Sequence, residues 1–235
     1  MEGYHANQSL LHTKLKAAYA IRTDGQQEYS TKVGINSYRI DVFDETKNTA
    51  YEIQLDNFGT SFYEKIRDLI KIHDVVVVHP IPIIQQVRTI GESKPRVIHK
   101  RNDFYTIFEK LVSFRVEFCS KKLSFELLKV EERIERKLSG YRRRGRPKYK
   151  LLSRDLVRVI DKREVEDHED IYSFLPENLP SRFTNKDLME GLEIKGGRRR
   201  RKKIAACMSY SLRNLGIIEK TGKQGRFLEF KIACR

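Results

Sequence analysis

Four consecutive valines, Val75–Val78, constrain the fold more than any other stretch of the chain. They lie between an aspartate and a His-Pro pair, and no alternate residue among them is polar, so this strand has to be covered on both faces. The segment 61–72 before it has apolar residues at helical spacing, and Ser61 with Glu64 predicts a capping box at its start. The pattern predicts a crossover helix followed by a buried parallel strand.

Two short strands joined by a polar turn precede this helix. Segments 38–43 and 50–54 alternate apolar and polar residues around the turn 45–49, which predicts a half-buried hairpin. With a helix over 9–21 and a strand over 28–33 before the hairpin, the sequence predicts an α/β domain. Its mixed sheet would begin with a three-stranded meander.

The middle of the chain is expected to add one strand, one helix and one hairpin. Residues 83–90 suggest a further strand, and 103–114 have a helical apolar stripe. Strands over 123–133 and 151–160 are predicted to pair, with the intervening basic segment forming a long loop at the hairpin tip. The acidic stretch 163–170 is expected to be an exposed connection between domains.

The carboxy-terminal segment has a different pattern. It predicts a short helix over 185–192, a break at Gly196-Gly197, a longer helix over 198–215, and two strands within 217–232 joined by a Gly-containing turn. Helix, turn, helix and a two-stranded wing resemble a winged-helix domain. We therefore expect two domains, residues 1–162 and 163–235.

Charge and composition restrict the class of partner. The formal net charge is +15 and the sequence pI is about 9.7, which is typical of a protein that binds a polyanion such as nucleic acid. No apolar run approaches the roughly 18 residues needed to span a bilayer, and the first residues lack a secretory signal pattern, so we expect a cytoplasmic protein without a membrane partner. The three cysteines and six histidines form no zinc or disulfide pattern.

The hairpin carries the residues that suggest chemistry. Phosphodiester hydrolysis needs a divalent metal held by oxygen ligands, and carboxylates on adjacent strands can supply them. Asp41 lies on one strand; Glu52 and Gln54 lie two apart on the other and therefore share a face. The main-chain carbonyl of Ile53 is a further candidate ligand. The register must not place Asp41 opposite Ile53, because a one-residue slip would turn its carboxylate to the other face.

Asp41, then Glu52-Ile53-Gln54, then a helix and a buried strand, resembles the PD-(D/E)xK nuclease core. That superfamily includes restriction enzymes, Holliday-junction resolvases and the end-cleaving nucleases of transposons. The resemblance covers roughly the first third of the chain and implies a restriction-endonuclease-like fold with Mg²⁺, or Mn²⁺, as cofactor. It assigns Asp41 and Glu52 to the metal and compares Glu28 with an extra upstream glutamate.

The sequence departs from the superfamily pattern at two positions. Ile40 stands where the pattern has proline, and Gln54 stands where it has lysine. A glutamine cannot act as a base and could only orient a water through its amide. Competence-associated CoiA-like nucleases are similar in having an ExQ element. Lys65, early in the next helix, is a candidate source of the missing cation, with a solvated helix face as its alternative.

Basic side chains in two segments are candidate DNA contacts. Around Arg-Gly-Arg-Pro, which resembles an AT-hook core, these are Arg143, Arg144, Arg146 and Lys148. At the start of the longer carboxy-terminal helix they are Arg198, Arg199, Arg200, Arg201, Lys202 and Lys203. Ser209, Tyr210 and Arg213 on that helix are candidates to reach bases, and Lys223 and Arg226 would contact DNA from the wing.

The sequence thus predicts a metal-dependent DNA endonuclease, acting on duplex or branched DNA, whose metal site involves Asp41, Glu52, Ile53 and Glu28, with Gln54 orienting water. A noncatalytic DNA-binding regulator with a degenerate nuclease core is the main alternative, and solvent-facing strand polars remain a simpler explanation of Asp41 and Glu52. An RNA-binding or RNA-cleaving protein is compatible with the charge, but the sequence lacks the aromatic RNP-type motif. A homodimer is expected if both strands of a duplex are cut.

Overall fold

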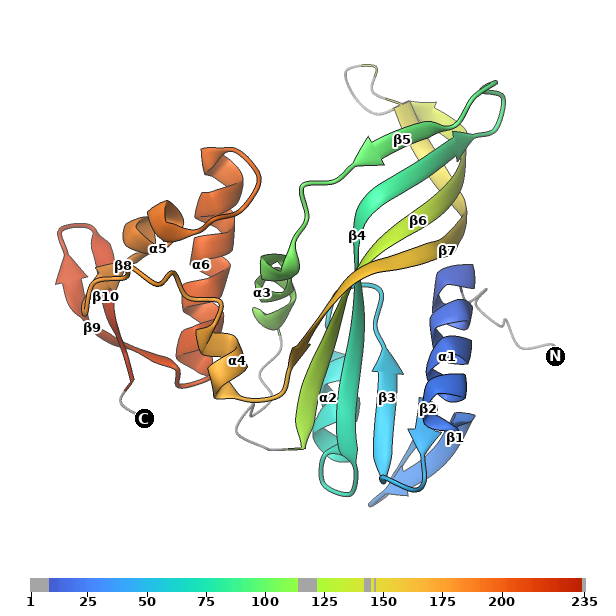
Figure 1. Cartoon of the computed structure of the whole chain (residues 1–235), viewed down its shortest axis with the longest axis horizontal. Helices are drawn as coiled ribbons and strands as arrows, with labels where there is room; N and C mark the ends of the chain where they lie inside the picture. The colour runs from blue at the N-terminus through green and yellow to red at the C-terminus, as the bar shows by residue number, and fades with distance from the viewer. Residues whose placement is uncertain (1–8, 114–121, 142–144, 146, 234–235) are drawn as a thin grey trace.

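A large mixed β-sheet with helices on both faces forms the first two thirds of the chain, and a smaller helical unit follows it (Figure 1). The computed structural model describes residues 9–113, 122–141, 145 and 147–233. The predicted mixed α/β class is therefore confirmed. None of the helices in these residues is long and apolar enough to cross a membrane.

The sheet unit begins with the predicted helix and meander and continues through the predicted crossover. Its elements are α1 (Leu10–Thr23), β1 (Gln26–Val33), β2 (Asn36–Asp44), β3 (Thr49–Ile53), α2 (Thr60–Leu69), β4 (Asp74–Thr89), β5 (Arg96–His99), η1 (Phe104–Thr106), α3 (Ile107–Leu111), β6 (Leu123–Tyr141) and β7 (Pro147–Val165). The strand order is β1-β2-β3-β4-β6-β7, with β5 paired to β4. The β3–β4 and β4–β6 pairs are parallel and the other pairs are antiparallel.

The valine run lies in the middle of the sheet, as predicted. Val75 and Val77 pack into the core under α2, whereas Val78 packs into a second core under α1, and Val76 packs against that second core. In Figure 1, α1 lies in front of the sheet and α2 behind it. Since successive side chains of a strand point to opposite faces, four valines cover both sides of the central strand with apolar surface.

Strands β4, β6 and β7 continue past the rest of the sheet and form, with β5, an arm that extends upward in Figure 1. Two buried glutamates hold its strands together. Glu131 accepts hydrogen bonds from Gln86 and Arg158, while Glu132 is bound by side chains from the same two neighbouring strands, β4 and β7. A buried carboxylate is tolerated there because it has cationic and amide partners.

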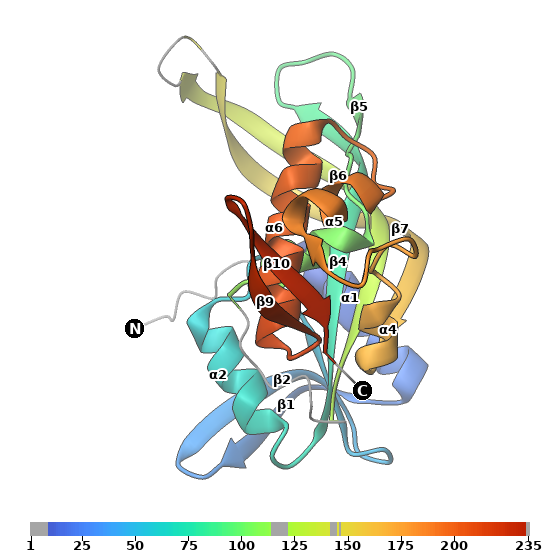
Figure 2. The same cartoon turned by 90° about the vertical axis from the view of Figure 1, so that its left-hand side faces the viewer.

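Within the described residues, the carboxy-terminal unit contains three helices and a small three-stranded sheet. Its elements are α4 (His168–Tyr172), β8 (Phe183–Thr184), α5 (Asn185–Gly191), α6 (Arg198–Asn214), β9 (Ile218–Gln224) and β10 (Phe227–Ile232). The sheet order is β8-β10-β9, and all pairs are antiparallel. Figure 2 shows the β9–β10 hairpin in front of α6.

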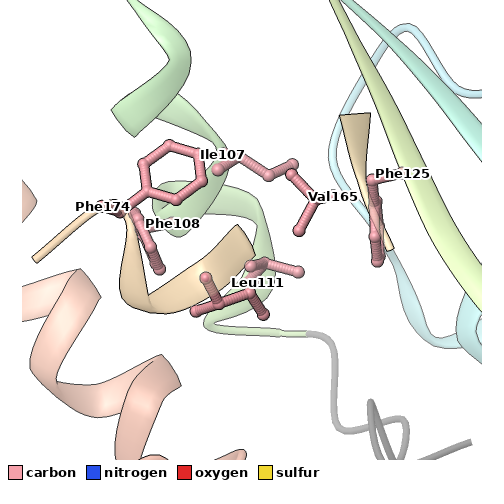
Figure 3. A pocket seen from close by; sticks show the side chains of 7 residues that line it. Ile107, Phe108, Leu111, Phe125, Val165 and Phe174 are labelled. Carbon is pink, nitrogen blue, oxygen red and sulfur yellow. The ribbon is translucent and has the colours of Figure 1, made fainter. Parts of the chain in front are cut away.

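One apolar core continues from the sheet unit into the carboxy-terminal unit. Helices α3 and α4 lie at the junction, where a small apolar void of about 10 Å³ is enclosed (Figure 3). The residues that line it come from α3, from β6 and β7, and from α4 and the segment just after it: Ile107, Phe108, Leu111, Phe125, Val165, Ile171 and Phe174. This void is too small for a ligand, so the junction is structural.

Several sequence-based boundaries were wrong. The capping box at Ser61 does not form, because α2 begins at Thr60 after Gly59 and has no side-chain cap. Segment 83–90 is not a separate strand but the continuation of β4. The predicted helix 103–114 is reduced to η1 and α3, with Phe114 outside the described residues.

The predicted long basic loop and the predicted exposed connection are also shorter than expected. Strands β6 and β7 remain paired as far as Tyr141 and Pro147, so the residues before and after this tip that were expected in the loop are strand. At the other end, β7 continues to the buried Val165, and α4 begins three residues later. The ends of both strands are rich in charged residues, and charge alone does not distinguish a solvated strand from a loop.

Candidate functional site

Asp41 lies on β2 and Glu52 lies near the carboxyl end of the adjacent antiparallel strand β3. The β2–β3 ladder pairs Val42 with Tyr51 and Phe43 with Ala50, so its continuation places Asp41 opposite Glu52 and not opposite Ile53. The backbone N–H of Ile53 donates to Asp41 Oδ2 at 2.9 Å. This register does not place Asp41 opposite Ile53; Asp41 contacts His12 of α1, whereas Glu52 contacts Lys65 of α2.

Burial and neighbouring charges act in opposite ways on the two carboxyl groups. Burial raises the pKa of Asp41, but hydrogen bonding and charge from His12, with smaller contributions from Ile53 N–H and Lys65, bring that pKa below its ordinary value. For Glu52, burial dominates: despite the opposing Lys65 charge, its pKa is raised to about 7, and the Asp41 charge adds to the rise. The site therefore favours an added positive charge at neutral pH.

Lys65 lies against Glu52 although it is distant from it in sequence. Its Nζ donates to Glu52 Oε2 at 2.7 Å and also to the main-chain carbonyl of Arg39. The side chain comes from the second turn of α2, which crosses the face of the sheet that Glu52 shares with Ala50. The structure thus brings together Asp41, Glu52 and the cation that the sequence lacks at position 54.

Gln54 does not face this group. It follows the last residue of β3, and its Nε2 donates to the carbonyl of Asn57 at 2.9 Å. Its main chain is fixed by β4, since its N–H donates to Val78 and its carbonyl accepts from His79 Nδ1. The prediction that Gln54 shares a face with Glu52 assumed that β3 continues through position 54, but β3 ends at Ile53.

The side chain of Glu28 forms its ion pairs with residues other than Asp41 and Glu52. Its carboxylate forms ion pairs with Lys16 and with Arg39, and its backbone has a positive φ of 55°. Among the described residues, no group of three or more His, Cys, Asp or Glu side chains could hold a metal ion. The predicted assistance of Glu28 to a shared metal therefore has no contact to support it.

Two observations bear on whether Asp41 and Glu52 suit a divalent cation. Within the described part of the chain, Glu52 Oε1 is buried and has no hydrogen-bond partner. A buried carboxylate oxygen without a partner costs about 1–3 kcal/mol or more, and a cation would remove this cost. Asp41 uses only Oδ2 in its contacts with His12 and Ile53, which leaves Oδ1 for a ligand. The donor set fits Mg²⁺ or Mn²⁺, both of which prefer oxygen.

A second candidate surface is a groove in the carboxy-terminal unit. It lies between the starts of α5 and α6 and the β9–β10 turn, and its volume is about 760 Å³. It is lined by Asn185, Lys186, Met189, Arg198, Arg199, Lys202, Arg226 and Phe227. Five of these eight side chains are cationic, so the groove suits a polyanion.

Five of the six consecutive basic residues of α6 divide into two groups. Arg200 pairs with Asp103 at 3.0 Å and Lys203 pairs with Glu109, so these two connect α6 to η1 and α3. Arg198, Arg199 and Lys202 line the groove, and within the described residues none of them forms an ion pair. A helix cannot direct six successive side chains to one side, which explains the division.

The other predicted DNA contacts have different outcomes. Ser209 cannot reach bases: it is buried, and its hydroxyl donates to the Ala206 carbonyl. This assignment was wrong because Ser209 lies on the apolar face with Ala205 and Leu212. Arg213 is exposed, with its guanidinium 5.6 Å from the ring centre of Tyr210.

On the β9–β10 hairpin and the arm, Lys223, Arg226 and Lys148 are exposed. Arg201 lies partly buried between the two groups of α6, and its Nε has no partner within the described chain. Arg143, Arg144 and Arg146 lie outside the described residues. The comparison with an AT-hook therefore remains a prediction.

The sheet unit is an α/β domain that carries a candidate acidic site at Asp41 and Glu52. Sequence comparison shows the family to which it belongs. The chain belongs to the family described as "Domain of unknown function (DUF8091)", which matches residues 9–166. That range begins at the cap of α1 and ends one residue after β7. No match was found among curated proteins or among solved structures.

Proposed function

We propose that the protein is a metal-dependent DNA endonuclease with a PD-(D/E)xK-like core and a winged-helix domain that binds DNA. The observation that carries this proposal is the grouping of Asp41, Glu52 and Lys65 at the end of β3, with Glu52 Oε1 buried and without a partner in the described chain. Around the group, the order helix, three-stranded meander, crossover helix and parallel strand agrees with the resemblance.

In this proposal Asp41 and Glu52 hold Mg²⁺ or Mn²⁺, and the carbonyl of Ile53 is an additional candidate ligand. The bound cation would lower the pKa of a water and offset charge on the phosphate. Lys65 replaces the lysine absent at position 54: its ammonium lies beside Glu52, where it can orient a water or contact the phosphate. Gln54 supports the turn after β3 through its bond to Asn57.

The carboxy-terminal unit would supply DNA affinity. Two helices followed by a β-hairpin, with β8 completing the small sheet, support the winged-helix interpretation. In that interpretation the groove places Arg198, Arg199 and Lys202 on the phosphate backbone from α6, and Arg226 from the wing. Such contacts give sequence-independent affinity that falls as salt rises.

The test is cleavage of duplex, branched and single-stranded DNA by the full chain, with Mg²⁺ or Mn²⁺ and with chelator. Asp41→Asn and Glu52→Gln keep side-chain shape but remove charge, and each should reduce the cleavage rate by about a hundredfold or more. Glu64→Gln, an exposed change on α2, is the matched control and should cleave normally. Cleavage that persists in both site variants, or in chelator, would overturn the proposal.

A DNA-binding regulator is the second candidate, and a specific observation favours it. The groove is lined by residues of the carboxy-terminal unit alone, so it could bind DNA without any chemistry in the sheet unit. Salt-sensitive DNA binding by the full chain, without cleavage under any metal condition and unchanged by Asp41→Asn, would establish this alternative.

A further inference from the structure

His12 contacts the candidate acidic site from a helix that precedes it. The side chain extends from the first turn of α1, and its Nε2 lies 3.3 Å from Asp41 Oδ2. The N–H of Ile53 donates to the same oxygen from the other side. Asp41 is therefore held by two donors on Oδ2, and neither contact involves Oδ1.

The position of His12 is fixed by the way α1 begins and packs. Ser9 caps the helix, and its hydroxyl accepts a hydrogen bond from the backbone N–H of His12. The neighbouring Leu11, with Leu15 one turn later, is buried against the sheet in the core that contains Ile53. The imidazole thus projects from an anchored turn, with little freedom to leave Asp41.

Stability alone does not account for this imidazole. The side chain of His12 is only 16% exposed, and within the described chain its Nδ1 is buried without a hydrogen-bond partner. A buried polar atom without a partner is unfavourable, so an apolar side chain would serve the packing better. What His12 contributes that an apolar residue cannot is the N–H that reaches Asp41.

We propose that His12 is a positioning residue of the metal site, whose Nε2–H orients Asp41 so that Oδ1 is presented to the cation beside Glu52. This inference rests on the proposed function. Hydrogen bonds to metal-ligating side chains fix their orientation, and losing one typically lowers metal affinity by about 10- to 100-fold. His12 is a positioning residue because its Nε2 contacts Asp41 Oδ2, so that it acts on the cation through Asp41.

The test is Mn²⁺ affinity of the full chain, measured by isothermal titration calorimetry without DNA. His12→Phe keeps a ring but removes the donor, and it should weaken Mn²⁺ binding by about tenfold or more. His12→Gln replaces Nε2–H with an amide N–H at a similar reach, and should recover most of the affinity. Thr13→Ala, an exposed change on the same turn, is the matched control and should bind as the unchanged protein does.

The outcomes separate this inference from the proposed function. If the unchanged protein binds Mn²⁺ and Asp41→Asn weakens binding, but His12→Phe does not, then His12 has no positioning role and the endonuclease proposal stands. If the unchanged protein binds no Mn²⁺, the metal site itself is wrong and both proposals fail. Equal weakening by His12→Phe and His12→Gln would indicate a packing role and would also overturn the inference.

Discussion

At the scale of single residues, Lys65 contacts Glu52, whereas the side chain of Gln54 is bonded to Asn57. The ExQ element places an uncharged amide where a cation was expected, and only the structure shows that α2 brings an ammonium to Glu52. Position 65 was a candidate because it lies early in the helix. Its contact with Glu52 depends on how α2 crosses the sheet, which local sequence does not determine.

Lys65→Met is expected to lower the cleavage rate by roughly a hundredfold at saturating Mn²⁺, because a fixed positive charge beside the reacting phosphate is lost. Gln54→Ala is the comparison, and it should have little effect, since the Gln54 amide is bonded to Asn57 and not to the carboxylates. Single-turnover cleavage assays measure both. The reverse ranking would return the water-orienting role to Gln54.

His79 is expected to make stability depend on pH. The imidazole is buried and its Nδ1–H donates to the Gln54 carbonyl, and burial lowers its pKa to about 4 from an ordinary 6.5. Because the unfolded chain takes up a proton at higher pH than the folded protein does, the contribution of neutral His79 to the free energy of unfolding is complete above pH 6.5. It falls as pH drops toward 4, by about 3 kcal/mol at most.

Denaturant unfolding at pH 7 and at pH 4.5 measures this loss. His79→Asn retains an N–H near the Nδ1 position but does not titrate, so the decrease in unfolding free energy between these pH values should become smaller. The comparison concerns the slope with pH, and a general loss of packing in the variant does not affect it. An identical slope in both proteins would show that other groups control acid stability.

At the scale of elements, periodicity was the reliable part of the sequence and charge was the misleading part. The valine run and the stripe of α2 gave the crossover unit and its place in the sheet, because both signals report burial. The predicted basic loop is shortened from both sides, because paired strands continue up to Tyr141 and resume at Pro147. The polarity of Ser209 suggested a contact with DNA bases, but α6 places this residue on its buried face.

The division of the basic residues in α6 gives a prediction for this element. Replacing Arg198, Arg199 and Lys202 by alanine should weaken DNA binding, because these residues line the groove. The slope of the logarithm of the binding constant against the logarithm of salt concentration should decrease by an amount that corresponds to up to about three phosphate contacts. Replacing Arg200 and Lys203 should change the salt dependence little, since both are paired with carboxylates of the sheet unit.

Fluorescence anisotropy of labelled duplex DNA over a series of salt concentrations distinguishes these variants. The Arg200 and Lys203 pair is a close control, because it removes basic charge from the same helix. If both sets reduce the salt slope in proportion to the charges removed, net charge and not the groove controls binding.

At the scale of the whole molecule, the two units are joined by a shared apolar junction and by two ion pairs from α6. Phe174 is central to it: its ring packs edge-on against Phe108 and Tyr105, and the Arg163 guanidinium lies 3.6 Å from its centre. The sequence could not predict this junction. The acidic segment 163–170 was expected to be an exposed connection, and the rings that pack against Phe174 belong to Tyr105 and Phe108, more than sixty positions earlier.

We therefore expect the chain to unfold as one cooperative unit. Phe174→Ala should lower the free energy of unfolding by about 3–5 kcal/mol, because it removes a buried aromatic ring and enlarges the void shown in Figure 3. Phe227→Ala, at a ring that is 38% exposed at the start of β10, is the control and should cost much less.

Urea unfolding followed by circular dichroism and by tyrosine fluorescence tests this prediction. In the unchanged protein the two signals should coincide, because the core that contains Phe174 spans both units. Two separate transitions in the unchanged protein would mean that the units fold independently and that the junction contributes little. Coincident transitions there, with a lower midpoint or a split transition in Phe174→Ala, would show that this side chain couples the sheet that carries Asp41 and Glu52 to the helix that carries the basic groove.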